Sequence, residues 1–351
     1  MTHNKTGIFN KFRYLFLVAV LSFGLIAVIG SGGGGDGDSD TTTGGGGGGT
    51  TPVELPTIGG TIYNSAQAVG DLLQVAFNPA TLEYGYTFIE PADGGSGTGT
   101  LSLMTGYTQY VYQDEYGMPV IVFPDNVFIA IPGGGDEGLL VGVPSLTTAY
   151  TASEIAGVYN FVQLAGTGGD LATYEGNYGT FKVNADGTWE SWDEGDLTSN
   201  TDIGGNAKDS GTWEDQGNGI VYAYRSGTKI ANVMIHPDYA GNAAEKVLLL
   251  DINDGDFKGI MLGVKQQALT SGSADGTYTL VESDEENLFE ITVAGNTVTH
   301  PDGMLPITYN SPWTGFVYGD DGTLVLMLPS GIFFGGGEDA DSAWVFAGIK
   351  K

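Results

Sequence analysis

The chain has 351 residues, no cysteine, 59 glycines and a formal net charge of −30. Without cysteine it has no disulfides, thiolate metal sites or cysteine nucleophiles, and 12 basic against 42 acidic residues exclude a nucleic-acid-binding surface. A hydrophobic fraction of 41% is enough for a sizeable core, which excludes a disordered acidic polymer.

Residues 1–30 have the features of an export signal. Three basic residues precede an apolar run from Tyr14 to Ile29, and small residues follow it. We expect cleavage near Gly30 or Ser31, with an uncleaved N-terminal anchor as the alternative. The expected location is the periplasm, outer surface or surroundings of a bacterium. Contact with a membrane is expected only through this segment, and only if it stays uncleaved.

The same segment resembles a bacterial lipoprotein leader, in which an apolar stretch ends at a small residue followed by cysteine and a glycine-rich tether. Ser31 stands where that cysteine would be. The resemblance therefore implies export without lipidation.

Residues 31–56 are predicted to form a flexible linker. The segment consists largely of glycine, aspartate and threonine, and six consecutive glycines occupy positions 44–49. Glycine loses more backbone entropy on ordering than any other residue, and this segment has little apolar surface to compensate. We expect the linker to hold the folded part away from its point of attachment.

Past the linker, the sequence predicts an all-β fold. Short apolar or alternating segments, such as Tyr107–Tyr112 and Leu324–Leu328, are bounded by Gly, Asp, Asn or Pro. Asp-Gly pairs, which suit tight hairpin turns, begin at Asp186, Asp254, Asp275, Asp302 and Asp321. The one weak helical pattern lies at Ser65–Val75.

Three stretches that begin and end alike indicate related β modules at residues 68–146, 152–268 and 272–351. The similar beginnings are Tyr84–Phe88, Gly157–Phe161 and Gly276–Leu280, and the similar ends are Leu140–Val143, Met261–Lys265 and Phe346–Lys350. Modules one and three are shorter. We expect them to be smaller sheets packed on the central module rather than complete barrels.

The central module is predicted to be an antiparallel up-and-down meander closed into an eight-stranded barrel. Closure removes both exposed sheet edges, and the interior of such a barrel either fills with side chains or holds one small ligand. The predicted strands are Gly157–Leu164, Gly179–Asn184, Thr188–Asp193, Ser210–Glu214, Ile220–Tyr224, Lys229–His236, Lys246–Ile252 and Phe257–Val264.

Three motifs make this stretch resemble the lipocalin-like modules of bacterial exported proteins: Gly157–Tyr159, Asn184–Trp189 and Ser210–Glu214. The resemblance implies a closed barrel. Tyr159 stands where lipocalins favour tryptophan, and this departure weakens the implication of ligand transport more than that of the barrel.

Four aromatic residues of the central module are the candidate ligand-binding set: Tyr159, Trp189, Trp213 and Tyr222. Such side chains could line the barrel and contact a small hydrophobic or carbohydrate ligand, and core packing is the alternative. Trp189 and Trp192 are expected on opposite faces of their strand.

The candidate metal site is an acidic segment that is similar in composition to a calcium loop. Its candidate ligands are Asp251, Asn253, Asp254 and Asp256. The EF-hand order requires glycine at the sixth position, whereas here glycine is fifth and Leu262 occupies the twelfth. A tight β-turn is therefore the favoured interpretation, with loose calcium binding as the alternative. No other cofactor is expected.

No catalytic set is recognisable. His236 and His300 each stand in His-Pro-Asp, where the proline is expected to end a strand and the aspartate to begin a turn. We therefore expect an exported, non-enzymatic acidic β protein, namely a cell-envelope or secreted binding module for a small or hydrophobic ligand. The alternatives are a structural or adhesive surface protein and a polysaccharide-acting hydrolase.

Overall fold

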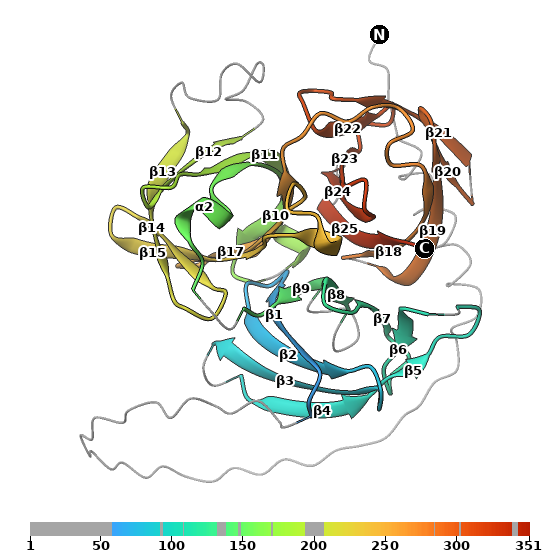
Figure 1. The fold of residues 1–351 in the computed structure, drawn as a ribbon, viewed down its shortest axis with the longest axis horizontal. Helices are drawn as coiled ribbons and strands as arrows, with labels where there is room; N and C mark the ends of the chain where they lie inside the picture. The colour runs from blue at the N-terminus through green and yellow to red at the C-terminus, as the bar shows by residue number, and fades with distance from the viewer. Residues whose placement is uncertain are drawn as a thin grey trace, which may run out of the picture.

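The computed structural model of the chain describes residues 58–351. The exceptions are residues 92–93, 108, 132–137, 147–148, 170, 194–206, 284, 302 and 339–342. The predicted export signal and linker therefore lie outside the described residues. Three antiparallel sheets make up the described part of the chain (Figure 1).

The all-β prediction is confirmed. The described residues form helix only in α2 (Ala152–Ile155), η1 (Leu171–Thr173) and η3 (Tyr239–Gly241). No helix in this part of the chain has the length and apolarity needed to span a bilayer. The prediction of a weak helix at Ser65–Val75 is wrong, because parts of two strands occupy this range. Both faces of the first strand are buried, so its sequence lacks the alternation that is typical of a strand.

The first sheet has nine strands in the order β4-β3-β2-β1-β9-β8-β7-β6-β5. Only Leu101 separates its two edge strands in the chain, so the sheet curls into a nearly closed barrel, which we call the first barrel. Its strands are β1 (Thr61–Gln67), β2 (Leu72–Asn78), β3 (Glu83–Glu90), β4 (Ser96–Thr100), β5 (Ser102–Leu103), β6 (Val111–Gln113), β7 (Pro119–Phe123), β8 (Val127–Ala130) and β9 (Leu140–Pro144).

The second barrel is closed and has eight strands, as predicted for the central module. Each predicted strand matches an observed one to within a few residues, because turn residues and alternation mark both ends of every hairpin. The strands are β10 (Gly157–Thr167), β11 (Glu175–Val183), β12 (Thr188–Asp193), β13 (Asp209–Asp215), β14 (Val221–Arg225), β15 (Thr228–His236), β16 (Val247–Asp254) and β17 (Phe257–Lys265).

The third barrel is also closed, so the expectation of a smaller sheet there is wrong. Eight strands fit into the shorter module because three of them span only four residues each and most turns are tight. The strands are β18 (Gly276–Glu282), β19 (Glu285–Ala294), β20 (Thr297–His300), β21 (Gly303–Tyr309), β22 (Phe316–Gly319), β23 (Leu324–Met327), β24 (Ile332–Glu338) and β25 (Ala343–Lys350).

The first and last strands of all three barrels pair in the same register. In each barrel a residue of the first strand pairs with a glycine of the last strand: Ser65 with Gly142, Phe161 with Gly263, and Leu280 with Gly348. A Cβ at Gly348 would lie 2.3 Å from the Thr279 carbonyl oxygen, so this position requires glycine. The shared closing register explains why the three module ends look alike in sequence.

The beginning assigned to the first module needs a correction. Tyr84–Phe88 belongs to β3, whereas the counterpart of β10 and β18 is β1, which begins before the expected boundary at residue 68. The three first strands share a fully buried tyrosine, which is Tyr63, Tyr159 or Tyr278. In β1 this tyrosine lies one residue further from the preceding glycine, which concealed the match.

A shared apolar core joins the barrels. Three clusters of buried side chains fill or line the barrel interiors, and a fourth, the central core, takes outward-facing residues from all three barrels, among them Val141, Leu262 and Ala347. Strands of different barrels meet there: β1 contacts β16, β11 contacts β24, and β7 contacts β19. The barrels accordingly surround a common centre (Figure 1).

Candidate functional site

The second and third barrels have filled interiors. The remaining cavities measure about 10 Å³ and about 20 Å³, which is too little for any organic ligand. In the second barrel Phe181 stacks on Trp189 with ring centroids 5.4 Å apart. Ile155 of α2 is buried in the same cluster, and α2 lies over one end of the barrel (Figure 1).

Three of the four candidate ligand-binding residues lie together in the second barrel, where they are part of its packed core. Tyr159 and Trp189 are buried inside the second barrel, and Trp213 packs beside them half-buried. Their polar atoms are used: the Tyr159 hydroxyl donates to the Ile155 carbonyl (2.7 Å), and Trp189 Nε1 donates to the Thr212 carbonyl (3.1 Å). The central barrel therefore leaves no space for a ligand beside these residues.

Tyr222 lies apart from the other three candidates, on the outer face of the second barrel. The Lys229 ammonium sits 4.0 Å from the centroid of its ring, a cation–π contact. Trp189 and Trp192 lie on opposite faces, as expected, because the first belongs to the barrel interior and the second to the central core.

The first barrel, by contrast, contains a large cavity. Its volume is about 390 Å³, which lies within the range of small-molecule sites. Apolar side chains form most of its wall: Leu73, Val75, Phe88, Leu101, Val120, Phe128, Ala130, Ile131 and Leu140. The turns at the carboxyl end of β1 border this cavity, because Gln67, Gly94, Asp114 and Tyr116 also line it.

Two tyrosines of β3 form an aromatic wall against glycines of β4. Tyr84 pairs with Gly99 and Tyr86 pairs with Gly97. A Cβ at Gly99 would lie 2.5 Å from the Tyr84 ring, and one at Gly97 would lie 2.7 Å from Tyr86, so the rings rest on bare backbone. Alternating aromatics opposite alternating glycines are the sequence signal that would have located this wall.

The polar groups at the cavity are phenols, carboxylates and the Gln67 carboxamide. The Tyr84 hydroxyl donates to Glu115 (3.3 Å), and burial, followed by the nearby carboxylates of Glu115 and Asp114, raises the pKa of Tyr84. Asp114 Oδ1 accepts from the backbone N–H groups of Tyr116 (2.9 Å) and Met118 (2.8 Å). None of the described residues that line the cavity is Lys, Arg or His.

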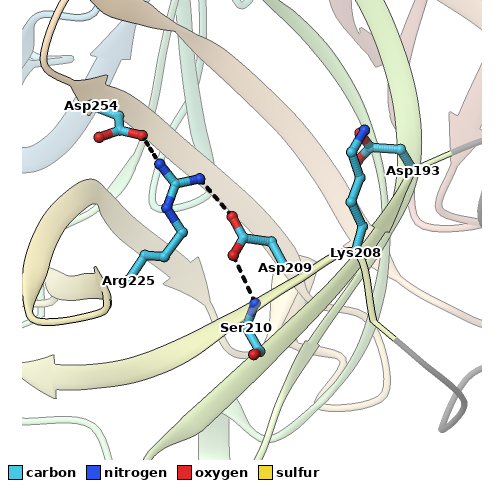
Figure 2. Close-up of polar contacts among 6 residues, drawn as sticks. All are labelled: Asp193, Lys208, Asp209, Ser210, Arg225 and Asp254. Atoms are coloured by element: carbon cyan, nitrogen blue, oxygen red, sulfur yellow. Dashed lines mark hydrogen bonds and ion pairs between the residues drawn. The ribbon is translucent and has the colours of Figure 1, made fainter.

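The four candidate calcium ligands do not converge. Figure 2 shows the Arg225 guanidinium between Asp254 and Asp209; Nη1 donates to Asp209 Oδ2 at 2.8 Å, and Nη2 pairs with Asp254. Asp251 is fully buried, Asn253 is half-buried and Asp256 is exposed in the turn. In the part of the chain that the structure describes, no three acidic or histidine side chains are grouped to hold a metal ion.

Both histidines end strands, as expected. His236 is the last residue of β15 and His300 the last of β20. His236 is buried, its Nε2 lies 3.2 Å from the Asp125 carbonyl oxygen of the first barrel, and burial lowers its pKa. This histidine therefore belongs to a packing contact between two barrels.

Comparisons with known proteins identify no family. No protein-family model and no curated protein matches the chain. Among solved structures, an endo-1,5-alpha-L-arabinanase from Thermotoga petrophila RKU-1 is 11% identical with a TM-score of 0.18 over 80% of this chain and 81% of that one. A protein of unknown function from the DUF3598 family of Nostoc punctiforme PCC 73102 is 7% identical with a TM-score of 0.16 over 83% and 96%. Likenesses this low support no inference about activity.

A buried carboxylate lies where the second barrel meets the first. Asn232 Nδ2 donates to Asp251 (2.7 Å) and to Glu90 of β3 (3.0 Å), and Lys229 pairs with Glu90. Burial raises the pKa of Asp251 to about 7; the Asn232 hydrogen bond and Lys229 act against this shift, and Glu90 and Asp71 add to it.

This raised pKa makes stability depend on pH. An unfolded aspartate ionises near pH 4, so between that pH and about 7 Asp251 binds more protons in the folded chain than in the unfolded chain, and its contribution to stability falls as pH rises. We expect Asp251→Asn to remove this fall, and to make the protein more stable than wild type at pH 8 by at most about 4 kcal/mol, at about 1.4 kcal/mol per pKa unit. Urea unfolding at pH 5 and pH 8 measures both effects.

Asp254→Asn on the same strand is the matched control. Its carboxylate is half-buried and paired with Arg225, so its loss should cost under about 1 kcal/mol and leave the pH dependence unchanged. Equal pH slopes for wild type and Asp251→Asn would contradict the role assigned to Asp251.

Proposed function

We propose that the chain is an exported, non-enzymatic binding protein that holds one small apolar ligand inside the first barrel. The observation that carries this proposal is the contrast among three barrels of related topology. The cavity of the first barrel measures about 390 Å³, whereas those of the other two measure about 10 Å³ and about 20 Å³. Protein interiors are normally close-packed, so a large cavity in one barrel of three supports a binding role for it.

The two filled barrels supply the support for this site. They bury the outer faces of β1, β8 and β9 in the central core, which fixes one wall of the first barrel. The predicted leader and linker support export, with the barrels held away from the cell surface. The candidate ligand residues are therefore Tyr84, Tyr86 and Tyr116 rather than those of the central barrel.

The ligand class follows from the lining. Its surface is apolar and aromatic, Asp114 and Glu115 lie at or near it, and no described lining residue carries a positive charge. Burying an anion there without a cationic partner costs several kcal/mol. We infer that the ligand is a neutral or cationic apolar molecule rather than a fatty-acid anion.

A displacement assay tests the proposal. N-phenyl-1-naphthylamine, a neutral probe that fluoresces in apolar surroundings, should bind the full chain saturably with a stoichiometry of one. 1-Octanol, octylamine and octanoate share one chain length and differ in charge. We expect the first two to displace the probe at concentrations at least tenfold below that of octanoate. Absence of saturable binding would contradict the proposed function, and equal potency of octanoate would contradict the ligand class.

A further inference from the structure

Two of the three barrel–barrel interfaces are joined by an asparagine on the outer face of a first strand. Asn64 Nδ2 of β1 donates to the Asn218 carbonyl of the second barrel (2.9 Å). Asn160 Nδ2 of β10 donates to the Thr314 carbonyl of the third barrel (2.8 Å). Both asparagines are fully buried. In each of these two interfaces, the first strand of one barrel therefore contacts a turn of the barrel that follows it in the chain.

The two acceptor turns are equivalent. They precede β14 and β22, the fifth strands of their barrels, and the residue after each carbonyl is a glycine of positive φ, Gly219 (82°) and Gly315 (86°). A Cβ on Gly315 would lie 2.8 Å from Asn160 Nδ2, and one on Gly219 would lie 3.2 Å from Asn64 Nδ2. Glycine thus lets the carboxamide approach the backbone in both interfaces.

The third interface lacks this carboxamide. The residue equivalent to Asn64 and Asn160 is Thr279 of β18, and it occupies the same register position relative to the closing glycine. Thr279 is 1% exposed, and its buried Oγ1 has no hydrogen-bond partner. The threonine side chain has no carboxamide, and it is too short to reach the position that the two asparagine carboxamides occupy.

A cavity lies where the missing side chain would reach. It measures about 160 Å³ between Thr279 and the turn before β6, the counterpart of the other two acceptor turns. Tyr107, Tyr110, Val111 and Ile349 give it apolar and aromatic surface, and the polar residues that line it are Gln109, Thr279, Lys350 and Lys351. A cavity of about 150 Å³ is large enough to bind benzene, so this one accommodates a small ring.

We propose that this third interface binds a small aromatic molecule carrying a primary carboxamide, of about the size of benzamide. Its amide would take the place that the Asn64 and Asn160 side chains fill elsewhere. One hydrogen-bond partner would be Thr279 Oγ1, and another the backbone carbonyl of Gln109, which precedes a residue of positive φ (Tyr110, 64°) as the other two acceptor carbonyls do. The aromatic side chains of the turn would cover the apolar part. The site is separate from the first-barrel cavity and does not depend on the function proposed for it.

Saturation-transfer difference NMR with benzamide tests the site in the full chain. We expect saturable binding to wild type, and binding at least tenfold weaker for toluene, which has the same ring without the carboxamide. Thr279→Asn supplies the carboxamide covalently, so it should abolish benzamide binding and raise the melting temperature. Thr279→Val keeps the shape and removes the hydroxyl, so it should weaken binding several-fold.

Ala130→Phe, which obstructs the first-barrel cavity, controls for the location of the ligand and should leave benzamide binding unchanged. Failure of benzamide to saturate wild type would overturn the proposal and leave a water-filled interface. Unchanged binding in both Thr279 variants would overturn it as well, because the ligand would then lie elsewhere.

Discussion

We expect Ala130→Phe to reduce binding of N-phenyl-1-naphthylamine at least tenfold while the protein stays folded. Ala130 is buried and lines the first-barrel cavity. A benzyl group there enters about 390 Å³ of existing space, so it excludes the probe without forcing neighbouring side chains apart. Fluorescence titration measures the binding, and urea unfolding should show a loss of stability under about 1 kcal/mol.

Ala223→Phe is the matched variant in the filled second barrel. Ala223 is also a buried, inward-facing alanine, but the cavity that it lines measures only about 10 Å³. Overpacking a filled core costs about 1–3 kcal/mol and occasionally more. Equal destabilisation by the two substitutions would show that the barrels do not differ in packing, and full probe binding by Ala130→Phe would place the probe elsewhere.

The second large effect is expected at the central core, where Phe316→Ala should destabilise the protein by about 3–5 kcal/mol. Phe316 of β22 is fully buried on the outer face of the third barrel. Its ring lies 5.0 Å from that of Trp313 and 5.7 Å from that of Tyr178 of the second barrel. Its truncation leaves a cavity between two barrels, and urea unfolding measures the cost.

Tyr318→Ala provides the control on the same strand. Tyr318 lies two residues further along and is 40% exposed, so its loss should cost about 0.5 kcal/mol or less. If Phe316→Ala proved as mild as Tyr318→Ala, the outer faces of the barrels would not share a core.

The strands of the second barrel could be predicted because their signals are local. Asp186-Gly187 and Asp254-Gly255 mark tight turns, and aromatic and aliphatic residues alternate between them. The opposite placement of Trp189 and Trp192 follows from the same period. Closure of the third barrel was missed because its four-residue strands, such as β20 and β22, carry too short a pattern to be distinguished from loops.

The position of the cavity could not be predicted because it depends on the summed volume of side chains from many strands. Trp189 and Phe181 fill the second barrel, whereas the first one is hollow beside Tyr84 although the rings of Tyr84 and Tyr86 cover the glycines of β4. The calcium candidate shows the same limit. Asp254 is engaged by Arg225, which lies 29 residues earlier in the chain, and no local motif records that pairing.

The most direct test of a hollow first barrel beside two filled ones is a crystal structure of the full chain grown with N-phenyl-1-naphthylamine. We expect density for the probe inside the first barrel, against Tyr84, Val120 and Phe128, and unbroken side-chain packing inside the second and third barrels. Probe density within either of those two barrels, or a first barrel filled by its own side chains, would contradict this assignment.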